Sequence, residues 1–363
     1  MRKYNICAYA ICKNEAHFVD RWVESLKDAD QIIVCDTGST DDTVKKLKEK
    51  GITVYEIRVD PWRFDVARNI SLGLVPSDAD ICVCTDLDEV MEPGWRSVLE
   101  NIWTPNTDAL YFMFTFTFNE DGTSGTTFWK KKIHARKGYR WTHPIHEILQ
   151  FQEKRRENII YEENIRLNHM PAAKESRNSY LQLLEQSVRE SPEDDRNMHY
   201  LGREYLYHQR WDDCIKTLEH HLSMPTATWR EERCASMRYI AMACMAKNMV
   251  GEAKSWLYRA IAEAPHLREP YVELVRIFYH EKNWPGVYHM VKDALKIRNR
   301  SSTYINEAYA WDYTLYDYGA LSAFELGRYD EALEFAENAL NMAPHIERLK
   351  NNRDLIKNYV LSE

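Results

Sequence analysis

Hydrophobic and polar positions follow two different rhythms along this chain. Between residue 5 and about residue 170, short apolar runs alternate with segments of helical periodicity. These predict, in chain order, strand 5–11, helix 15–27, strand 31–35, a helix from 40 to about 51, strand 53–58, helix 65–74 and strand 81–85. This α/β alternation predicts a mostly parallel, twisted sheet with helices on both faces.

Residues 109–118 change to a period of two, with phenylalanines at 112, 114, 116 and 118 on one side. A hairpin-like segment, 128–141, follows and turns near Lys137-Gly138. We expect it to add antiparallel strands at the edge of the sheet.

From about residue 175 only helical periodicity remains, and the chain becomes similar to itself. Four small residues recur at matching positions, 39, 34 and 45 residues apart, and they are Cys214, Ala253, Val287 and Ala332. The pattern resembles tetratricopeptide repeats of about 34 residues with insertions, and an irregular helical bundle is the alternative. The predicted domains are therefore 1–173 and 174–363.

Composition limits the class of protein. The 363 residues are 44% hydrophobic and 29% charged, which is typical of a globular protein of two domains. A net charge of −8 disfavours a nucleic-acid partner. No apolar run is long enough to span a membrane, no signal peptide precedes the first strand, and the eight cysteines lack CxxC spacing. We expect reduced thiols and a cytoplasmic location.

Candidate chemistry lies after strand 81–85, in Thr85-Asp86-Leu87-Asp88-Glu89. If the strand alternation continues, Asp86 and Asp88 emerge on one face, roughly 7 Å apart. Two neighbouring carboxylates need a counter-charge, which a divalent cation bound to phosphates would supply. An open α/β sheet binds its ligand at the carboxyl ends of its strands, where this pair is expected.

Four segments in order resemble family 2 glycosyltransferases of the GT-A (Rossmann-like) fold, in the subgroup with C-terminal tetratricopeptide repeats. They are Ala10-Ile11-Cys12-Lys13-Asn14-Glu15, the run from Ile32 to Thr43, Ala67-Arg68-Asn69, and the Asp-x-Asp segment from Thr85 to Glu89. The resemblance is strong over residues 5 to about 100 and weak from there to 170.

The resemblance implies roles for particular residues. It places the nucleotide at Ala10, Glu15, Asp36, Arg68 and Asp86, with Asp36 contacting uracil. Ordinary alternatives remain: Asp36 can form a turn, Glu15 can serve a helix dipole, and Arg68 can be a solvated arginine. Metal ligation, to Mn²⁺ or Mg²⁺, is implied for Asp88 and Asp86, with His146 completing the site and His169 a weaker candidate.

Two acids compete for the role of general base, Glu147 in the His143–Glu147 segment and Asp121 in a turn-like segment. A basic cluster at 130–132, 136, 137 and 140 could offset diphosphate charge or bind an anionic acceptor, but a solvated hairpin face is favoured.

Together these features predict a metal-dependent, inverting transferase that moves a sugar from a UDP-sugar to a protein, peptide or glycan acceptor. One alternative is a nucleotidyltransferase, although residues 10–17 contain no glycine for a phosphate loop. The other is a non-catalytic peptide-binding scaffold with a relic nucleotide domain. The helical repeats could also support a homodimer.

Overall fold

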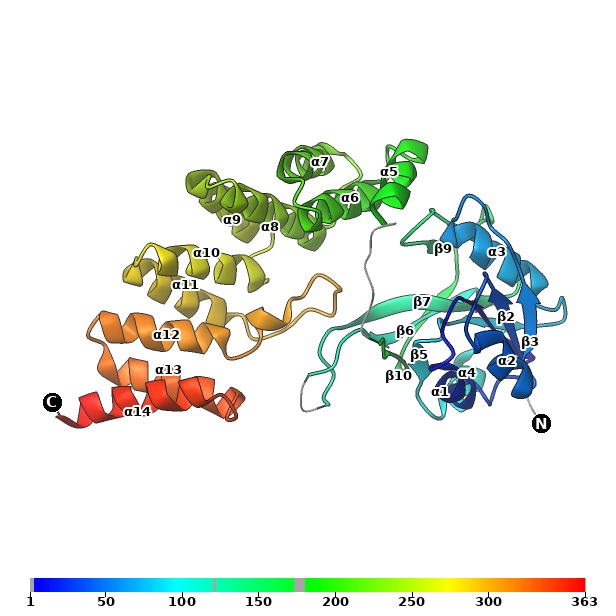
Figure 1. Cartoon of the computed structure of the whole chain (residues 1–363), viewed down its shortest axis with the longest axis horizontal. Helices are drawn as coiled ribbons and strands as arrows, with labels where there is room; N and C mark the ends of the chain where they lie inside the picture. The colour runs from blue at the N-terminus through cyan, green and yellow to red at the C-terminus, as the bar shows by residue number, and fades with distance from the viewer. Residues whose placement is uncertain (1–2, 120–121, 173–179, 363) are drawn as a thin grey trace. The chain divides into compact units, whose positions relative to one another are not determined.

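The computed structural model describes residues 3–119, 122–172 and 180–362, which form two compact units, Met1–Ser187 and Val188–Glu363 (Figure 1). The domain boundary predicted between residues 173 and 174 falls outside the described residues.

The first unit is built on an eight-stranded sheet with strand order β3-β2-β1-β4-β7-β6-β10-β5 and a two-stranded sheet of β8 and β9. The strands are β1 (Ile6–Cys12), β2 (Gln31–Asp36), β3 (Thr53–Glu56), β4 (Ile81–Cys84), β5 (Glu89–Met91), β6 (Ala109–Thr115), β7 (Thr127–Ala135), β8 (Tyr139–Thr142), β9 (Ile148–Phe151) and β10 (Ile159–His169). The helices are α1 (Val19–Ser25), α2 (Thr43–Glu49), α3 (Phe64–Leu74), α4 (Trp95–Ile102) and the linking α5 (Tyr180–Glu190).

Strands β3, β2, β1 and β4 are parallel neighbours, as the alternation of elements predicts. Residues of β1 alternate between two cores: Ile6, Ala8 and Ala10 pack with residues of α1, α2 and α4, whereas Cys7 and Tyr9 pack with α3. Helices therefore cover both faces of the sheet. The carboxyl ends of β1, β2 and β4 meet at one edge, which carries the predicted motifs.

The predicted hairpin at 128–141 is wrong. Strand β7 lies inside the large sheet, antiparallel to both β4 and β6, and β8 pairs with β9 instead. Period-2 patterning finds strands but not their partners, because pairing depends on residues far away in the chain. Strand β10, which the sequence pattern does not predict, lies parallel to β6 and antiparallel to β5.

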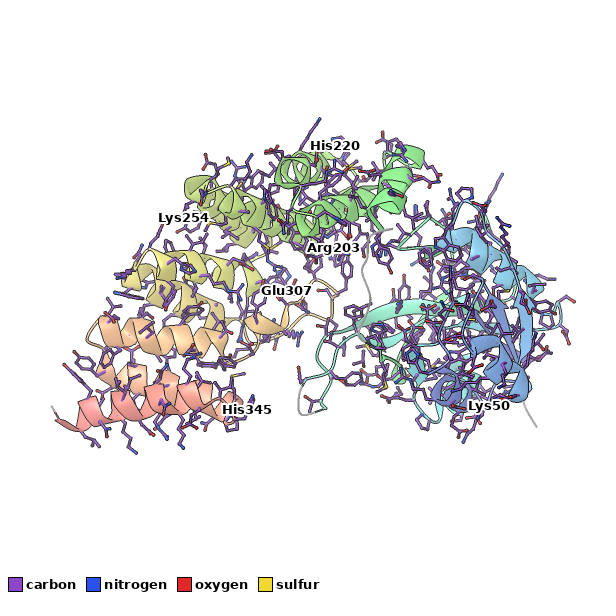
Figure 2. The ribbon with its side chains drawn as sticks, viewed as in Figure 1. Lys50, Arg203, His220, Lys254, Glu307 and His345 are labelled. Carbon is purple, nitrogen blue, oxygen red and sulfur yellow. The ribbon has the colours of Figure 1, made fainter. Side chains whose placement is uncertain are left out.

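The second unit is helical throughout its described residues, apart from connecting turns. Its helices are α6 (Asp195–Tyr207), α7 (Trp211–Ser223), α8 (Arg230–Ala246), α9 (Val250–Glu263), α10 (Glu269–His280), α11 (Trp284–Lys296), η1 (Ala308–Ala310), α12 (Thr314–Glu325), α13 (Tyr329–Met342) and α14 (Glu347–Ser362). Helices α6 to α13 form four successive pairs, with Arg203 on the inner side of the array and His220 on its outer side (Figure 2). An irregular bundle is excluded by this order.

The four pairs share one turn geometry. The residue before each second helix's N-cap has a positive φ, and these residues are Gln209, Asn248, Lys282 and Gly327. Their spacings of 39, 34 and 45 equal those of the four small residues found in the sequence, all of which are fully buried. The longest spacing contains the 297–313 connection between α11 and α12. Within a pair the helices touch closely, because a Cβ on Gly202 would lie 2.3 Å from Leu218.

Replacing Lys282 with glycine should stabilise the repeat unit. Lys282 is exposed and has φ 55°, a conformation that costs an L-residue about 1–2 kcal/mol and glycine little. We expect a gain of about 0.5–1 kcal/mol in the free energy of unfolding, measured by urea denaturation. Glu281, its neighbour, has φ −80°, so Glu281→Gly should destabilise by a similar amount. Equal losses in both variants would contradict this interpretation of the turn.

A chain of buried polar side chains joins β1, β7 and β8 in the first unit. The indole of Trp141 donates to the hydroxyl of Tyr9 at 3.0 Å, and that hydroxyl donates to Nε2 of His134 at 2.8 Å. Nδ1 of His134 donates to the carbonyl of Ala135 at 2.7 Å. Burial lowers the pKa of His134 to about 3, so the imidazole is neutral in the folded protein.

The unfolded state should therefore bind one more proton than the folded state as pH falls below about 6.5. His134 should cost the folded protein about 1.4 kcal/mol per pH unit in that range. The free energy of unfolding in urea should be measured at pH 6.5 and pH 5.0. It should change less between these two pH values in His134→Gln than in the native sequence, by the contribution of about one proton. Identical pH dependences would show that His134 titrates normally.

No helix in the described ranges is both long and apolar enough to cross a membrane. All eight cysteines belong to the described part of the chain, and each is a buried free thiol.

Candidate active site

The Asp-x-Asp segment is a turn and not the continuation of a strand. Strand β4 ends at Cys84, and the amide of Glu89 donates to the carbonyl of Asp86 at 3.0 Å. Leu87 is fully buried in the core, which pins the middle of the turn. The strand alternation that placed Asp86 and Asp88 on one face is therefore wrong, and the two carboxylates have different surroundings.

Asp86 is held by two cations of the protein. Its Oδ1 accepts from Arg68 at 2.7 Å and its Oδ2 from Lys132 at 2.9 Å. Burial alone would raise the pKa of Asp86, but Arg68 and then Lys132 outweigh it and hold that pKa well below its usual range. Arg68 lies on α3 and is 5% exposed, so it is not a solvated helix arginine.

Strand β7 supplies the cations that sequence analysis placed on a solvated face. The Lys132 ammonium is 2.8 Å from both oxygens of Glu89, which is 2% exposed, and Lys130 approaches Glu89 at 3.7 Å. Lys131 pairs on its own with Glu157, at 2.8 Å. The solvated-face interpretation of these three lysines is therefore wrong. Arg136 is also structural, since it donates to the carbonyl of Val75 at 2.7 Å.

The cluster around Asp86 balances its own charge. Its cations are Arg68, Lys130 and Lys132, and its carboxylates are Asp86, Glu89 and Glu147. Such a balanced set offers no net positive charge to an approaching diphosphate. The counter-charge that we expected from a metal at Asp86 is supplied by the protein itself.

Asp88 has a different partner. Its Oδ2 lies 3.2 Å from Nε2 of His169, at the end of β10. Two backbone contacts bring Asp88 and His169 together. His169 pairs with Glu89 between β10 and β5, and the amide of Met170 donates to the carbonyl of Asp88. Nδ1 of His169 lies 3.3 Å from the carbonyl of Phe116, which can only accept, so Nδ1 carries a proton. In the neutral ring of His169, Nε2 then carries no proton, and its lone pair faces the carboxylate of Asp88.

This pair fits a divalent cation better than Asp86 does. An imidazole nitrogen and a carboxylate oxygen 3.2 Å apart can both bind one Mn²⁺. The predicted trio of Asp86, Asp88 and His146 is not preassembled, because its ligand atoms do not all lie within 4.8 Å of one another. Mg²⁺ and similar ions are commonly held by one or two carboxylates together with substrate phosphates, which such a partial site suits.

Asp36 ends β2 and is 3% exposed. Its Oδ2 accepts from the amides of Gly38 and Ser39 at 3.0 and 2.9 Å, which is the geometry of a turn. A hollow of about 430 Å³ opens beside it, bordered also by Glu56 and Arg58.

The remaining described residues that the sequence predicts for the site lie on β1, before α1 and between β8 and β9. Ala10 is buried within β1, and its carbonyl accepts from Ser71 at 3.0 Å. Glu15 precedes α1, and its amide donates to Thr43 at 2.8 Å. His146 and Glu147 lie between β8 and β9, and Arg68 donates to Glu147. Asp121 lies outside the described residues.

Neighbouring motif residues explain how Arg68 is positioned. The Asn69 side chain donates to the carbonyl of Trp141 at 2.8 Å and accepts from its amide at 2.9 Å. The amide of Phe64 donates to the carbonyl of Pro144 at 2.9 Å. These contacts tie α3 to the segment that contains Glu147. The Ala67-Arg68-Asn69 motif alone does not predict these contacts.

Comparison with known proteins identifies the first unit. Residues 8–167 match the family described as Glycosyl transferase family 2. A 102-residue segment is 28% identical to the lipopolysaccharide core biosynthesis glycosyltransferase LpsC of Rhizobium meliloti (strain 1021). That segment is 28% of this chain and 37% of the relative, so the match spans about a third of the relative's length.

Among solved structures, the C-terminal part of a TPR repeat-containing protein from Cytophaga hutchinsonii is similar, with a TM-score of 0.41 and 15% identity, over 49% of this chain and 64% of that one. A thermophilic TPR protein from Thermus thermophilus has a TM-score of 0.35 and 18% identity, over 49% of this chain and 89% of that one. The match over residues 8–167 and the four helix pairs that follow show a domain of glycosyl transferase family 2 joined to C-terminal tetratricopeptide-like repeats.

Proposed function

We propose that this chain is a metal-dependent glycosyltransferase that moves a sugar from a nucleotide-diphosphate sugar, a UDP-sugar, to a protein, peptide or glycan acceptor. The observation that carries the proposal is the carboxylate and imidazole pair, Asp88 and His169, beside a charge-balanced cluster at the carboxyl edge of a family 2 domain.

The donor diphosphate would lie next to Asp88. Because the Asp86 cluster is already neutral, a diphosphate needs a further positive charge. Mn²⁺ bound by Asp88 and His169, or Mg²⁺ held by Asp88 and the phosphates, would supply it as a Lewis acid. Arg68 and Lys132 fix the Asp86 carboxylate, which can then accept a hydrogen bond from the ribose. For the uracil we propose the hollow beside Asp36, with Asp36 shaping the turn that borders it.

The transfer is a single displacement with inversion. An acceptor oxygen forms a bond to the anomeric carbon while the bond from that carbon to the diphosphate oxygen breaks, and the electron pair leaves with the diphosphate. The acceptor proton passes to a carboxylate base. Glu147 and Asp121 are the candidates, and the contact with Arg68 gives Glu147 a positioning role in the conformation described.

The repeat unit is proposed to hold the acceptor, because arrays of helix pairs present an extended concave surface. The family 2 domain argues against a nucleotidyltransferase. Intact contacts of Arg68 and Asp86 argue against a relic domain in a peptide-binding scaffold.

A thermal-shift panel of nucleotides and nucleotide sugars, with and without Mn²⁺, tests the donor. We expect a shift that needs both a uridine diphosphate group and the metal, and slow hydrolysis of the matching UDP-sugar. A panel with no metal-dependent shift and no hydrolysis would overturn the proposal and leave the scaffold alternative.

A further inference from the structure

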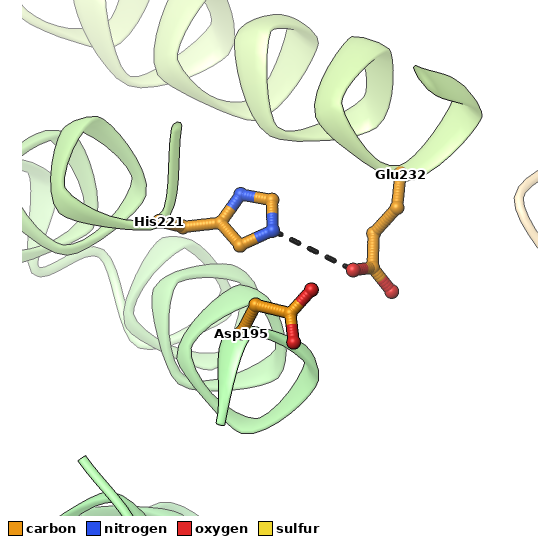
Figure 3. Close-up of side chains that lie close together, drawn as sticks. All are labelled: Asp195, His221 and Glu232. Carbon is orange, nitrogen blue, oxygen red and sulfur yellow. Dashed lines mark ion pairs between the residues drawn. The ribbon is translucent and has the colours of Figure 1, made fainter. Parts of the chain in front are cut away.

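The repeat unit contains a second cluster of metal-ligand types, on three consecutive helices. Asp195 begins α6, His221 lies near the end of α7, and Glu232 lies in the first turn of α8 (Figure 3). Their ligand atoms all lie within 4.8 Å of one another, and this is the one such group of three found in residues 3–119, 122–172 and 180–362. His221 is fully buried, Glu232 is 4% exposed, and Asp195 is half-buried.

One ring nitrogen of this cluster, Nε2 of His221, has no hydrogen-bond partner. The hydroxyl of Ser236 lies 3.0 Å from Nδ1 of His221 and 2.7 Å from Nδ1 of His199. A hydroxyl has one proton, so it donates to one ring and accepts from the other. When it accepts from His221, the Nε2 of that ring is a bare lone pair that points at the carboxylate of Glu232. This Nε2 is buried and forms no hydrogen bond.

The distance between these two atoms suits a shared cation. Nε2 of His221 and Oε1 of Glu232 are 3.5 Å apart, which is long for a hydrogen bond between them. Two ligands of a tetrahedral Zn²⁺, each about 2.0–2.1 Å from the metal, lie about 3.3–3.4 Å from each other. The distance between His221 and Glu232 is therefore close to the ligand-ligand distance of a zinc site, and the carboxylate of Asp195 lies within 4.8 Å of both ligand atoms.

Outer contacts orient both buried ligands. Ser236 fixes the ring of His221 through Nδ1, and the hydroxyl of Tyr304 donates to Oε2 of Glu232 at 2.6 Å. That bond leaves Oε1 directed at His221. Metal-binding histidines and carboxylates are commonly held by partners of this kind.

We propose that Asp195, His221 and Glu232 bind one Zn²⁺ ion, with solvent as the fourth ligand on the half-buried side of Asp195. The ion would tie α6, α7 and α8 together at the start of the repeat array. Imidazole nitrogen in the ligand set favours zinc over the hard ions Mg²⁺ and Ca²⁺. This site lies in a different unit from Asp88 and does not depend on the proposed transfer reaction.

The test uses the full chain, freed of metal with a chelator and titrated with Zn²⁺ in a calorimeter. We expect at least one equivalent bound with micromolar or tighter affinity, a rise in the melting temperature, and a visible spectrum of four-coordinate Co²⁺ when cobalt replaces zinc. Asp88→Asn should keep this equivalent, which separates the site from any metal at the active site.

Matched variants locate the site. His221→Ala should remove the equivalent, whereas His220→Ala, one residue away and exposed on the outer side of α7, should keep it. Asp195→Asn, at a half-buried position, should weaken binding at least tenfold even if His221→Ala fails to fold. The proposal is overturned if the native chain binds no stoichiometric zinc, or if Asp195→Asn and Glu232→Gln bind it as tightly as the native chain.

Discussion

Asp88→Asn is expected to lower kcat/KM for sugar transfer by about a thousandfold, which corresponds to about 4 kcal/mol of lost transition-state stabilisation. The amide keeps the shape of the side chain but loses the charge that faces Nε2 of His169 at 3.2 Å. A divalent cation would then have one neutral ligand in place of an anionic one. The measurement is the initial rate of nucleotide diphosphate release with the preferred donor, at several Mn²⁺ concentrations.

Asp42→Asn provides the matched control. Asp42 is exposed, and its side chain makes no capping hydrogen bond at the start of α2, so the same substitution there should leave the rate unchanged. His169→Gln should also lose metal-dependent activity while keeping the melting temperature of the native chain. Transfer by Asp88→Asn at the native rate would exclude Asp88 from the reaction.

The sequence predicts the first half of the sheet well, because each of β1, β2, α3 and β4 shows its own period over enough residues to be recognised. The second half is harder, since β7 enters the sheet between β4 and β6 and reverses its direction. That insertion buries Lys132 and brings Lys130, which is only partly buried, beside Glu89. A run of three lysines is expected to be solvated unless its distant carboxylate partners are known.

The candidate site was predicted in part. The motifs place Arg68, Asp86 and Asp88 at one edge of the sheet, and the structure brings them there. The histidine beside Asp88 was predicted less well, because His146 belongs to a recognisable segment and His169 does not. Pairing of β10 with β5 brings His169 to Asp88, and neither strand was predicted.

Lys132→Met should destabilise the first unit by about 3–5 kcal/mol, because it leaves the buried carboxylate of Glu89 without its main counter-charge. Lys132 is 4% exposed and bridges Asp86 and Glu89 at 2.9 and 2.8 Å. Lys130, at 3.7 Å from Glu89, is too distant to replace it in the present geometry. The free energy of unfolding in urea at pH 7 measures the loss, with the slope against urea checked for constancy.

A second substitution separates charge from packing. Glu89→Gln removes one of the two carboxylates, so the Lys132→Met/Glu89→Gln double variant should be more stable than the sum of the two single losses predicts. Lys137→Met, at an exposed position in the same region, should change stability by less than about 0.5 kcal/mol. If Lys132→Met were as harmless as Lys137→Met, or if the two losses simply added, Lys132 would not be the cation that holds this turn. The inference that the Asp86 cluster is neutral, on which the proposed need for a metal rests, would then fail as well.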